Sequence, residues 1–182
     1  MGPTILLVPG LRDHVPEHWQ THLEKKVANA RSVPPLTENK LSLASRIDAL
    51  DKAVADCPTP PLLVAHSAGV MMVVHWAKLY RRAIHGALLV APPDLERPMP
   101  EGYPTLDSLQ SNGWLPIPLK QLPFRSIVCT STNDPLAAHD RVEGFAARWG
   151  SSIVSLGAVG HVNPASGFGE WPGVEELIGL LD

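Results

Sequence analysis

The sequence predicts a three-layer α/β sandwich, in which a mostly parallel β-sheet carries helices on both faces. Short strands that are apolar at nearly every position alternate with longer amphipathic segments along the chain. Strands of this kind occur in parallel sheets that are buried on both sides. Of the 182 residues, 45% are hydrophobic and 18% are charged, so we expect one globular domain that spans residues 1–182.

The first third of the chain contains one expected strand and two expected helices. Residues 4–8 (TILLV) are an aliphatic run closed by a Pro-Gly pair, which is typical of a buried strand and a turn. Residues 16–30 begin with Pro and Glu and then repeat apolar residues at every fourth position, which predicts a helix. Residues 42–55 show the same periodicity after Ser42, a residue type that favours the helix N-cap.

The rest of the chain continues this alternation with one exception. We expect strands at 62–66, 86–91, 126–131 and 151–156, and helices at 68–80, around 139–149 and at 172–182. The exception is the segment 92–123, which has little periodicity and holds eight of the nineteen prolines. A segment of this length is either a disordered linker or a functional loop. Because it contains Tyr103 and Trp114, we expect an ordered loop over the edge of the sheet, too short to form a cap domain, and therefore an open site.

Composition argues against several classes of function. The net charge of −3 gives no basic surface for nucleic acid. The N-terminus lacks a charged region and a long apolar run, so we expect no signal peptide, and no stretch approaches the roughly 18 apolar residues of a membrane span. Cys57 and Cys129 are too few for a disulfide scaffold. We therefore expect free thiols in a cytoplasmic protein.

The segment Ala65-His66-Ser67-Ala68-Gly69 joins an expected buried strand directly to an expected buried helix. Small residues are needed at such a corner because the two backbones come close together. The pattern is similar to the nucleophile elbow G-x-S-x-G, in which a sharp turn exposes the serine at the carboxyl end of the sheet. Ala65 replaces the first glycine, and its single methyl group is the smallest possible intrusion. The sequence therefore predicts Ser67 as a catalytic nucleophile.

A serine hydroxyl needs a base, and the base needs an acid that orients it. Asp134 follows the expected strand at 126–131, and His161 follows the strand at 151–156. The order Ser, Asp, His is that of α/β-hydrolases, and all three positions fall at the edge of the sheet where open α/β folds place their sites. Asp94 also follows a strand and is an alternative acid, but its proline-rich loop suggests a polar, solvent-facing position.

The remaining histidines have simpler interpretations. We expect His66 and His75 on turn and helix surfaces, and His85 and His139 in solvent. His14, His18 and His22 are four residues apart, but a Val-Pro pair interrupts any helix between the first two, and no carboxylate or cysteine completes a metal site. We expect neither a metal nor a cofactor. For the oxyanion hole we expect the backbone N–H groups of Ala68 and of Leu11, since Gly10 allows that loop to curl toward the serine.

Four segments together resemble a known family. They are AHSAG, STNDP, GHVNPASGFGEWP and the early VPG…EHWQ. Their combination is similar to the small, lidless α/β-hydrolases grouped with retinoblastoma-binding protein nine. The resemblance covers nearly the whole chain and implies a trimmed hydrolase sheet with Ser67 as nucleophile, Asp134 as acid and His161 as base. It implies no substrate, and some members of that family are discussed mainly as binding proteins.

The sequence thus predicts a serine hydrolase that cleaves small carboxylic esters through an acyl-enzyme intermediate. An amidase or aminopeptidase would use the same residues, and a protein-binding module with an unused triad is an alternative from another class. The expected partner is a small-molecule ester, with neither nucleic acid nor membrane involved. Trp19, Trp114 and Trp171 either line the site or belong to the core.

Overall fold

The computed structural model describes residues 2–181, which form one six-stranded, fully parallel sheet with the strand order β2-β1-β3-β4-β5-β6. The strands are β1 (Ile5–Val8), β2 (Ala30–Ser32), β3 (Leu62–His66), β4 (Gly86–Val90), β5 (Ser126–Thr130) and β6 (Ser152–Ser155). Each strand pairs in parallel with its neighbours. Their carboxyl ends therefore lie along one edge of the sheet, where the loops that follow them can meet.

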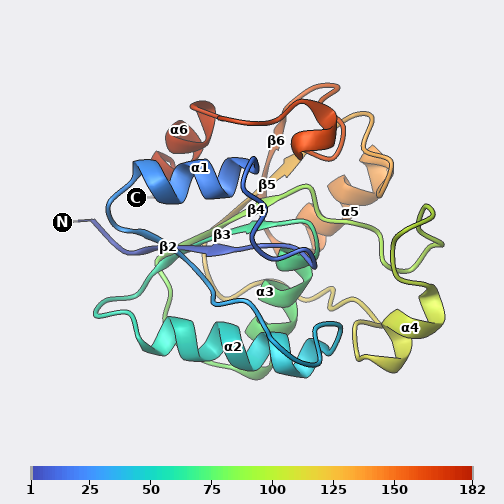
Figure 1. Cartoon of the computed structure of the whole chain (residues 1–182), viewed down its shortest axis with the longest axis horizontal. Helices are drawn as coiled ribbons and strands as arrows, with labels where there is room; N and C mark the ends of the chain where they lie inside the picture. The colour runs from blue at the N-terminus through green and yellow to red at the C-terminus, as the bar shows by residue number, and fades with distance from the viewer. Residues whose placement is uncertain (1, 182) are drawn as a thin grey trace.

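Helices cover both faces of this sheet, as the sequence predicts (Figure 1). Helices α1 (Trp19–Lys26) and α6 (Gly173–Gly179) lie on one face, and α2 (Leu43–Ala55), α3 (Ala68–Leu79) and α5 (His139–Trp149) pack on the other. Successive residues of a strand point to opposite faces. In β1, Leu6 and Val8 accordingly join the core under α2 and α3, whereas Ile5 and Leu7 join the core under α1.

The edge strand β2 and the full extent of α1 differ from the sequence prediction. The expected helix over 16–30 is shorter in the structure, because Val27 takes an extended conformation and ends α1. The chain then turns into β2, whose residues Ala-Arg-Ser are only partly buried. A short edge strand with polar, half-exposed side chains has neither helical nor alternating periodicity, so the sequence pattern gave no sign of it.

The segment 92–123 is ordered and contains a short helix, α4 (Leu106–Ser111), which begins at an N-cap formed by Thr105. Leu109 and Trp114 are fully buried and belong to the same core as α2 and α3. This part of the chain therefore packs as a wall beside the sheet edge, as expected from its aromatic residues. The helix escaped prediction because it has fewer than two turns and shows too little apolar periodicity.

Two further expectations concern cysteines and membranes. Cys57 and Cys129 are both free thiols. Within residues 2–181, no helix is long and apolar enough to cross a membrane.

Candidate active site

Ser67 stands at the sharp corner between β3 and α3. It is the N-cap of α3 and takes φ = 55° and ψ = −127°, a conformation that non-glycine residues rarely adopt and that costs about 1–3 kcal/mol. Gly69 makes the corner possible, since a Cβ at this position would lie 2.1 Å from the carbonyl oxygen of Val8. At Gly10 an added Cβ would make only ordinary contacts. The close approach that the sequence suggested is therefore required at Gly69 and not at Gly10.

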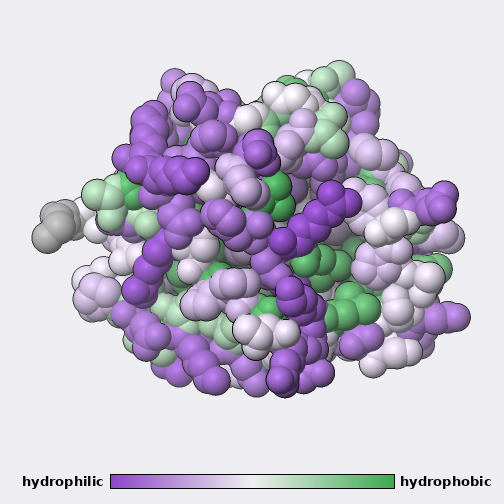
Figure 2. Space-filling view, in the orientation of Figure 1, coloured by the Kyte–Doolittle hydropathy of each residue, from purple (hydrophilic) through white to green (hydrophobic). Residues whose placement is uncertain are grey.

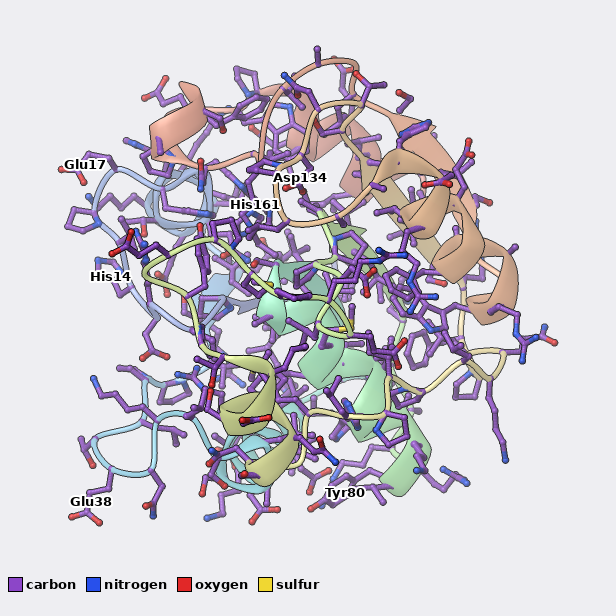
Figure 3. The ribbon with its side chains drawn as sticks, turned by 90° about the vertical axis from the view of Figure 1, so that its right-hand side faces the viewer. His14, Glu17, Glu38, Tyr80, Asp134 and His161 are labelled. Atoms are coloured by element: carbon purple, nitrogen blue, oxygen red, sulfur yellow. The ribbon has the colours of Figure 1, made fainter. Side chains whose placement is uncertain are left out.

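The loops after β3, β5 and β6 bring three of the predicted side chains into one hydrogen-bonded chain. Ser67 Oγ lies 2.8 Å from His161 Nε2, and His161 Nδ1 lies 2.8 Å and 3.0 Å from the two carboxylate oxygens of Asp134. The side chains of His161 and Asp134 are only 6% and 3% exposed. They lie next to each other near the centre of the face in Figure 3. A proton on Nδ1 that is donated to the carboxylate leaves Nε2 free to accept the serine proton.

Asp94 is not part of this chain. Contrary to the expectation of a solvent-facing loop, its side chain is buried, and its carboxylate faces Arg97 and Arg141 and accepts the N–H of Glu96. Asp94, in the segment after β4, therefore belongs to an ion-pair cluster with Arg97 and Arg141. Of the two acidic candidates, the structure brings only Asp134 to the histidine.

The loops that carry Asp134 and His161 are also connected to each other. Asn133 Oδ1 accepts hydrogen bonds from the backbone N–H of Gly160 at 2.7 Å and from the Ser131 hydroxyl at 3.0 Å. Asp134 additionally accepts the N–H of Leu136 at 2.9 Å. These contacts fix the distance between the two loops, so that the carboxylate faces the imidazole without rearrangement.

A cavity of about 400 Å³ opens at Ser67, a volume within the usual range of small-molecule sites. Its wall includes Leu11 and Ala68, the two residues expected to supply oxyanion donors. The wall also includes part of the segment 92–123, namely Pro93, Leu95, Met99, Gly102, Tyr103, Pro104 and Leu109. Figure 2 shows hydrophobic side chains in a hollow on the side where β1 and β3 end. The expected open site therefore has a wall built by that segment.

The model of a family described as serine hydrolase matches residues 5–179 of the chain. The chain belongs to this serine hydrolase family. The match spans all six strands and includes Ser67, Asp134 and His161. The narrower resemblance to retinoblastoma-binding protein nine stays a prediction. A comparison with curated proteins finds no match.

Solved structures share the fold over nearly the whole length of this serine hydrolase. A YdeN-like protein from Pectobacterium atrosepticum is 28% identical, with a TM-score of 0.81 over 98% of this chain and 90% of that protein. The ydeN gene product of B. subtilis is 19% identical, with a TM-score of 0.73 over 99% of this chain and 98% of that one. Est1E from Butyrivibrio proteoclasticus is 11% identical, with a TM-score of 0.68 over 98% of this chain and 85% of that protein. At such low identity the last two show the fold alone.

Two buried histidines of the hydrolase support the loop that carries His161. His18 Nδ1 accepts the N–H of Gln20, so His18 Nε2 is free to donate to His66 Nδ1 at 3.2 Å. His66 Nε2 then donates to the carbonyl oxygen of His161 at 2.8 Å. All three hydrogen bonds form together only when both rings are neutral and have these tautomers.

The pKa values of these two histidines agree with neutral rings. Burial, and to a lesser extent electrostatic repulsion from His161 and His22, lower the pKa of His18 to about 4. Burial also lowers the pKa of His66 well below its usual range, with repulsion from His161 and His18 as further causes. The chain of hydrogen bonds is thus intact at neutral pH. The expectation that His66 lies on a turn surface is wrong, as is the surface position expected for His75, which is buried against the Trp114 carbonyl.

Trp19 supports the same loop from α1. Its indole Nε1–H donates to the carbonyl oxygen of Val162 at 3.0 Å. Val162 has φ = 52°, which is unfavourable for a β-branched residue. This strained backbone is held by two hydrogen bonds, one from Trp19 to the carbonyl of Val162 and one from His66 to the carbonyl of His161. Sequence reasoning missed these two hydrogen bonds, since they join positions that are 143 and 95 residues apart and leave no local pattern.

The loop with the expected oxyanion donor Leu11 is anchored by Arg46 of α2. The buried guanidinium donates to the carbonyl oxygens of Leu11 at 3.2 Å and Lys40 at 2.6 Å, and pairs with Asp13 at 3.0 Å. These contacts fix the carbonyl of Leu11, and Leu11 itself is part of the cavity wall. An arginine inside an amphipathic helix gave no sign of this role in the sequence.

The sequence did not decide whether three tryptophans line the site or belong to the core, and in the structure all three lie outside the cavity wall. Trp19 and Trp114 are buried in the two cores, and Trp171 packs against Trp19 with perpendicular rings. Among residues 2–181 there is no group of three or more histidine, cysteine or acidic side chains that could hold a metal ion.

Proposed function

We propose that this serine hydrolase cleaves carboxylic esters with small acyl groups through an acyl-enzyme intermediate. The observation that carries the proposal is the chain of hydrogen bonds from Ser67 through His161 to Asp134, which opens on a cavity. The strained turn at Ser67 supports it as well, because backbone strain of this kind concentrates at functional residues.

In the proposed first step, Ser67 Oγ attacks the carbonyl carbon of the ester while His161 Nε2 takes the hydroxyl proton. The tetrahedral intermediate then collapses, and the alcohol leaves with the proton that His161 returns. Water attacks the resulting acyl-serine by the same route, releasing the acid and restoring Ser67. Asp134 stays ionised throughout and stabilises the imidazolium that forms in each half-reaction.

The negative charge of the tetrahedral oxygen needs hydrogen-bond donors. We propose the N–H groups of Ala68 and Leu11, both on the cavity wall. Ala68 is the first residue of the twelve-residue helix α3, so the positive end of the helix dipole reinforces its N–H. Anchoring of the Leu11 loop by Arg46 keeps the second donor in place before substrate binds.

The charge of the cavity wall favours an esterase over an aminopeptidase. An aminopeptidase must bind the ammonium group of its substrate, which calls for a free carboxylate near the nucleophile. Asp13 is the carboxylate residue on the cavity wall, and it is already paired with Arg46. A binding module with an unused triad would not need an imidazole within hydrogen-bond distance of both a serine and a buried carboxylate.

The test compares short-chain aryl esters, longer-chain aryl esters and the matching anilides, using wild-type protein and Ser67→Ala. We expect turnover of short esters, much slower turnover of anilides and none above background for Ser67→Ala. Faster hydrolysis of anilides would indicate an amidase. Ester turnover that persists in Ser67→Ala, or absence of turnover of every substrate by the wild type, would contradict the proposal.

A further inference from the structure

We propose that the ester cleaved by this hydrolase carries a negatively charged group, such as a carboxylate, which Arg12 and Lys40 bind at the mouth of the cavity. The inference rests on the proposed function, because it names the substrate class of the same site. It is carried by the charge balance and placement of the residues that form the cavity wall.

The cavity wall carries two positive charges that no carboxylate neutralises. Its permanently charged side chains are Arg12, Asp13 and Lys40. Asp13 is neutralised by Arg46, which lies behind the wall and is 3% exposed. Within residues 2–181, no ion pair joins Arg12 or Lys40 to an acidic residue. A net positive cavity is notable in a chain whose net charge is −3, and it attracts anionic ligands.

Arg12 is placed where it can contact a substrate bound at Ser67. It directly follows Leu11, the expected oxyanion donor, and its guanidinium lies over the ring of Tyr103 at 5.9 Å from the centroid. Tyr103 belongs to the segment 92–123 and also lines the cavity. The contact therefore holds the Arg12 side chain beside another residue of the cavity wall, with the guanidinium edge still available for an anion.

Lys40 approaches the cavity from a second direction. Its backbone carbonyl accepts a hydrogen bond from Arg46 at 2.6 Å, which fixes this residue beside the Leu11 loop. Its ammonium has no hydrogen-bond or ion-pair partner within residues 2–181 and is exposed at the cavity wall. The acidic residues Glu17 and Glu38, which flank the two cations in sequence, point outward and away from the cavity (Figure 3).

The rest of the wall fits an aliphatic spacer between the anion and the ester. Leu41, Met99 and Leu109 are apolar side chains of the cavity lining, and apolar walls with a few placed polar groups are typical of small-molecule sites. An ester of a dicarboxylic acid, or an ester whose alcohol part carries a carboxylate, has this distribution of charge. A neutral ester of the same length leaves the two cations without a partner.

The experiment measures kcat/KM for two matched pairs of esters. The first pair is mono(4-nitrophenyl) adipate and 4-nitrophenyl hexanoate, which differ in a terminal carboxylate on the acyl side. The second pair is 4-acetoxybenzoate and phenyl acetate, which differ in a carboxylate on the alcohol side. In each pair the ratio of anionic to neutral kcat/KM is compared among wild type, Arg12→Gln/Lys40→Gln, the charge-keeping Arg12→Lys, and a control with the exposed Lys120→Gln.

We expect a ratio above one in at least one pair for the wild type. In that pair the double variant should lower the ratio by about three- to tenfold, as expected for ion pairs of exposed side chains. Added salt should lower the wild-type ratio in the same direction, whereas Arg12→Lys and Lys120→Gln should keep it near the wild-type value. A ratio of one or less in both pairs, or a ratio that the double variant leaves unchanged, would overturn the inference.

The two proposals fail in different ways. If the wild type hydrolyses the neutral esters in a Ser67-dependent manner but shows no preference for charge, the inference is wrong and the proposed function stands. If no ester of either pair is hydrolysed, the proposed function fails and the inference fails with it.

Discussion

Replacing Asp134 with asparagine should cost this hydrolase most of its turnover while leaving its shape unchanged. In the structure, Asp134 Oδ1 accepts the N–H of Leu136 at 2.9 Å, and Oδ2 faces His161 Nδ1 at 2.8 Å. An asparagine has only one oxygen to serve both donors. If the amide oxygen stays with Leu136, the amide NH₂ faces His161 and forces the proton onto Nε2. The imidazole then donates to Ser67 and cannot accept its proton.

The expected loss is large because the wrong tautomer removes the base. In a serine protease, the same exchange lowers kcat by about 10⁴, which corresponds to about 5.5 kcal/mol of barrier. We expect a loss of the same order in kcat for an ester, with a smaller change in KM. Stopped assays of ester hydrolysis with purified protein measure both quantities, and urea denaturation shows whether the variant is folded.

Asp94→Asn is the matched control, because Asp94 is a buried carboxylate beyond a neighbouring strand. Its partners are Arg97, Arg141 and the N–H of Glu96. Its replacement should lower stability by about 1 kcal/mol and kcat by less than about tenfold. If Asp94→Asn abolished turnover while Asp134→Asn did not, the assignment of the acid would be refuted.

Three further predictions concern the surroundings of the site. Gly69→Ala places a Cβ 2.1 Å from a backbone carbonyl oxygen and should lower the free energy of unfolding by several kcal/mol. The control is Gly144→Ala in α5, where nothing lies within 4 Å of an added Cβ, and this variant should be neutral or slightly stabilising. Equal midpoints of urea denaturation for the two variants would contradict this prediction. Because the pKa of His18 is lowered to about 4 in the folded protein, the unfolded chain binds more protons at acid pH. As the pH falls from about 6.5 to about 4, His18 should therefore lower the free energy of unfolding by up to about 3 kcal/mol. An equally steep loss of stability in His18→Gln would exclude His18 as the cause. His66→Phe removes the donor to the His161 carbonyl in the loop after β6 and should reduce kcat about 10- to 100-fold. His66→Gln keeps a donor and should recover part of the lost kcat. Equal kcat values for the two variants would show that this hydrogen bond is unimportant.

The sequence predicted the elements that carry strong local patterns. Strands such as β3 and β4 are uninterrupted apolar runs, because both of their faces are buried. Ser67 comes directly after β3, and Asp134 and His161 lie in the loops that follow β5 and β6, so their positions could be predicted from the strands. The geometry that unites them could be inferred because the carboxyl ends of parallel strands share one edge.

The features that escaped prediction depend on contacts between distant parts of the chain. β2 is a strand only because its backbone pairs with β1, and its side chains carry no strand signal. His18 and His66 look like surface histidines until the fold brings them together at 3.2 Å and buries both. Arg46 reads as a polar position of an amphipathic helix, although its guanidinium holds the Leu11 loop.

The most direct test of the central assignment is labelling with a fluorophosphonate, which reacts with serines activated as nucleophiles. Intact-mass measurement followed by peptide mapping gives both the stoichiometry and the position of the label. We predict one label per chain, on Ser67, with no labelling of Ser67→Ala and strongly slowed labelling of His161→Ala. A label on another serine, or an unlabelled wild type, would contradict the assignment of Ser67 as the nucleophile.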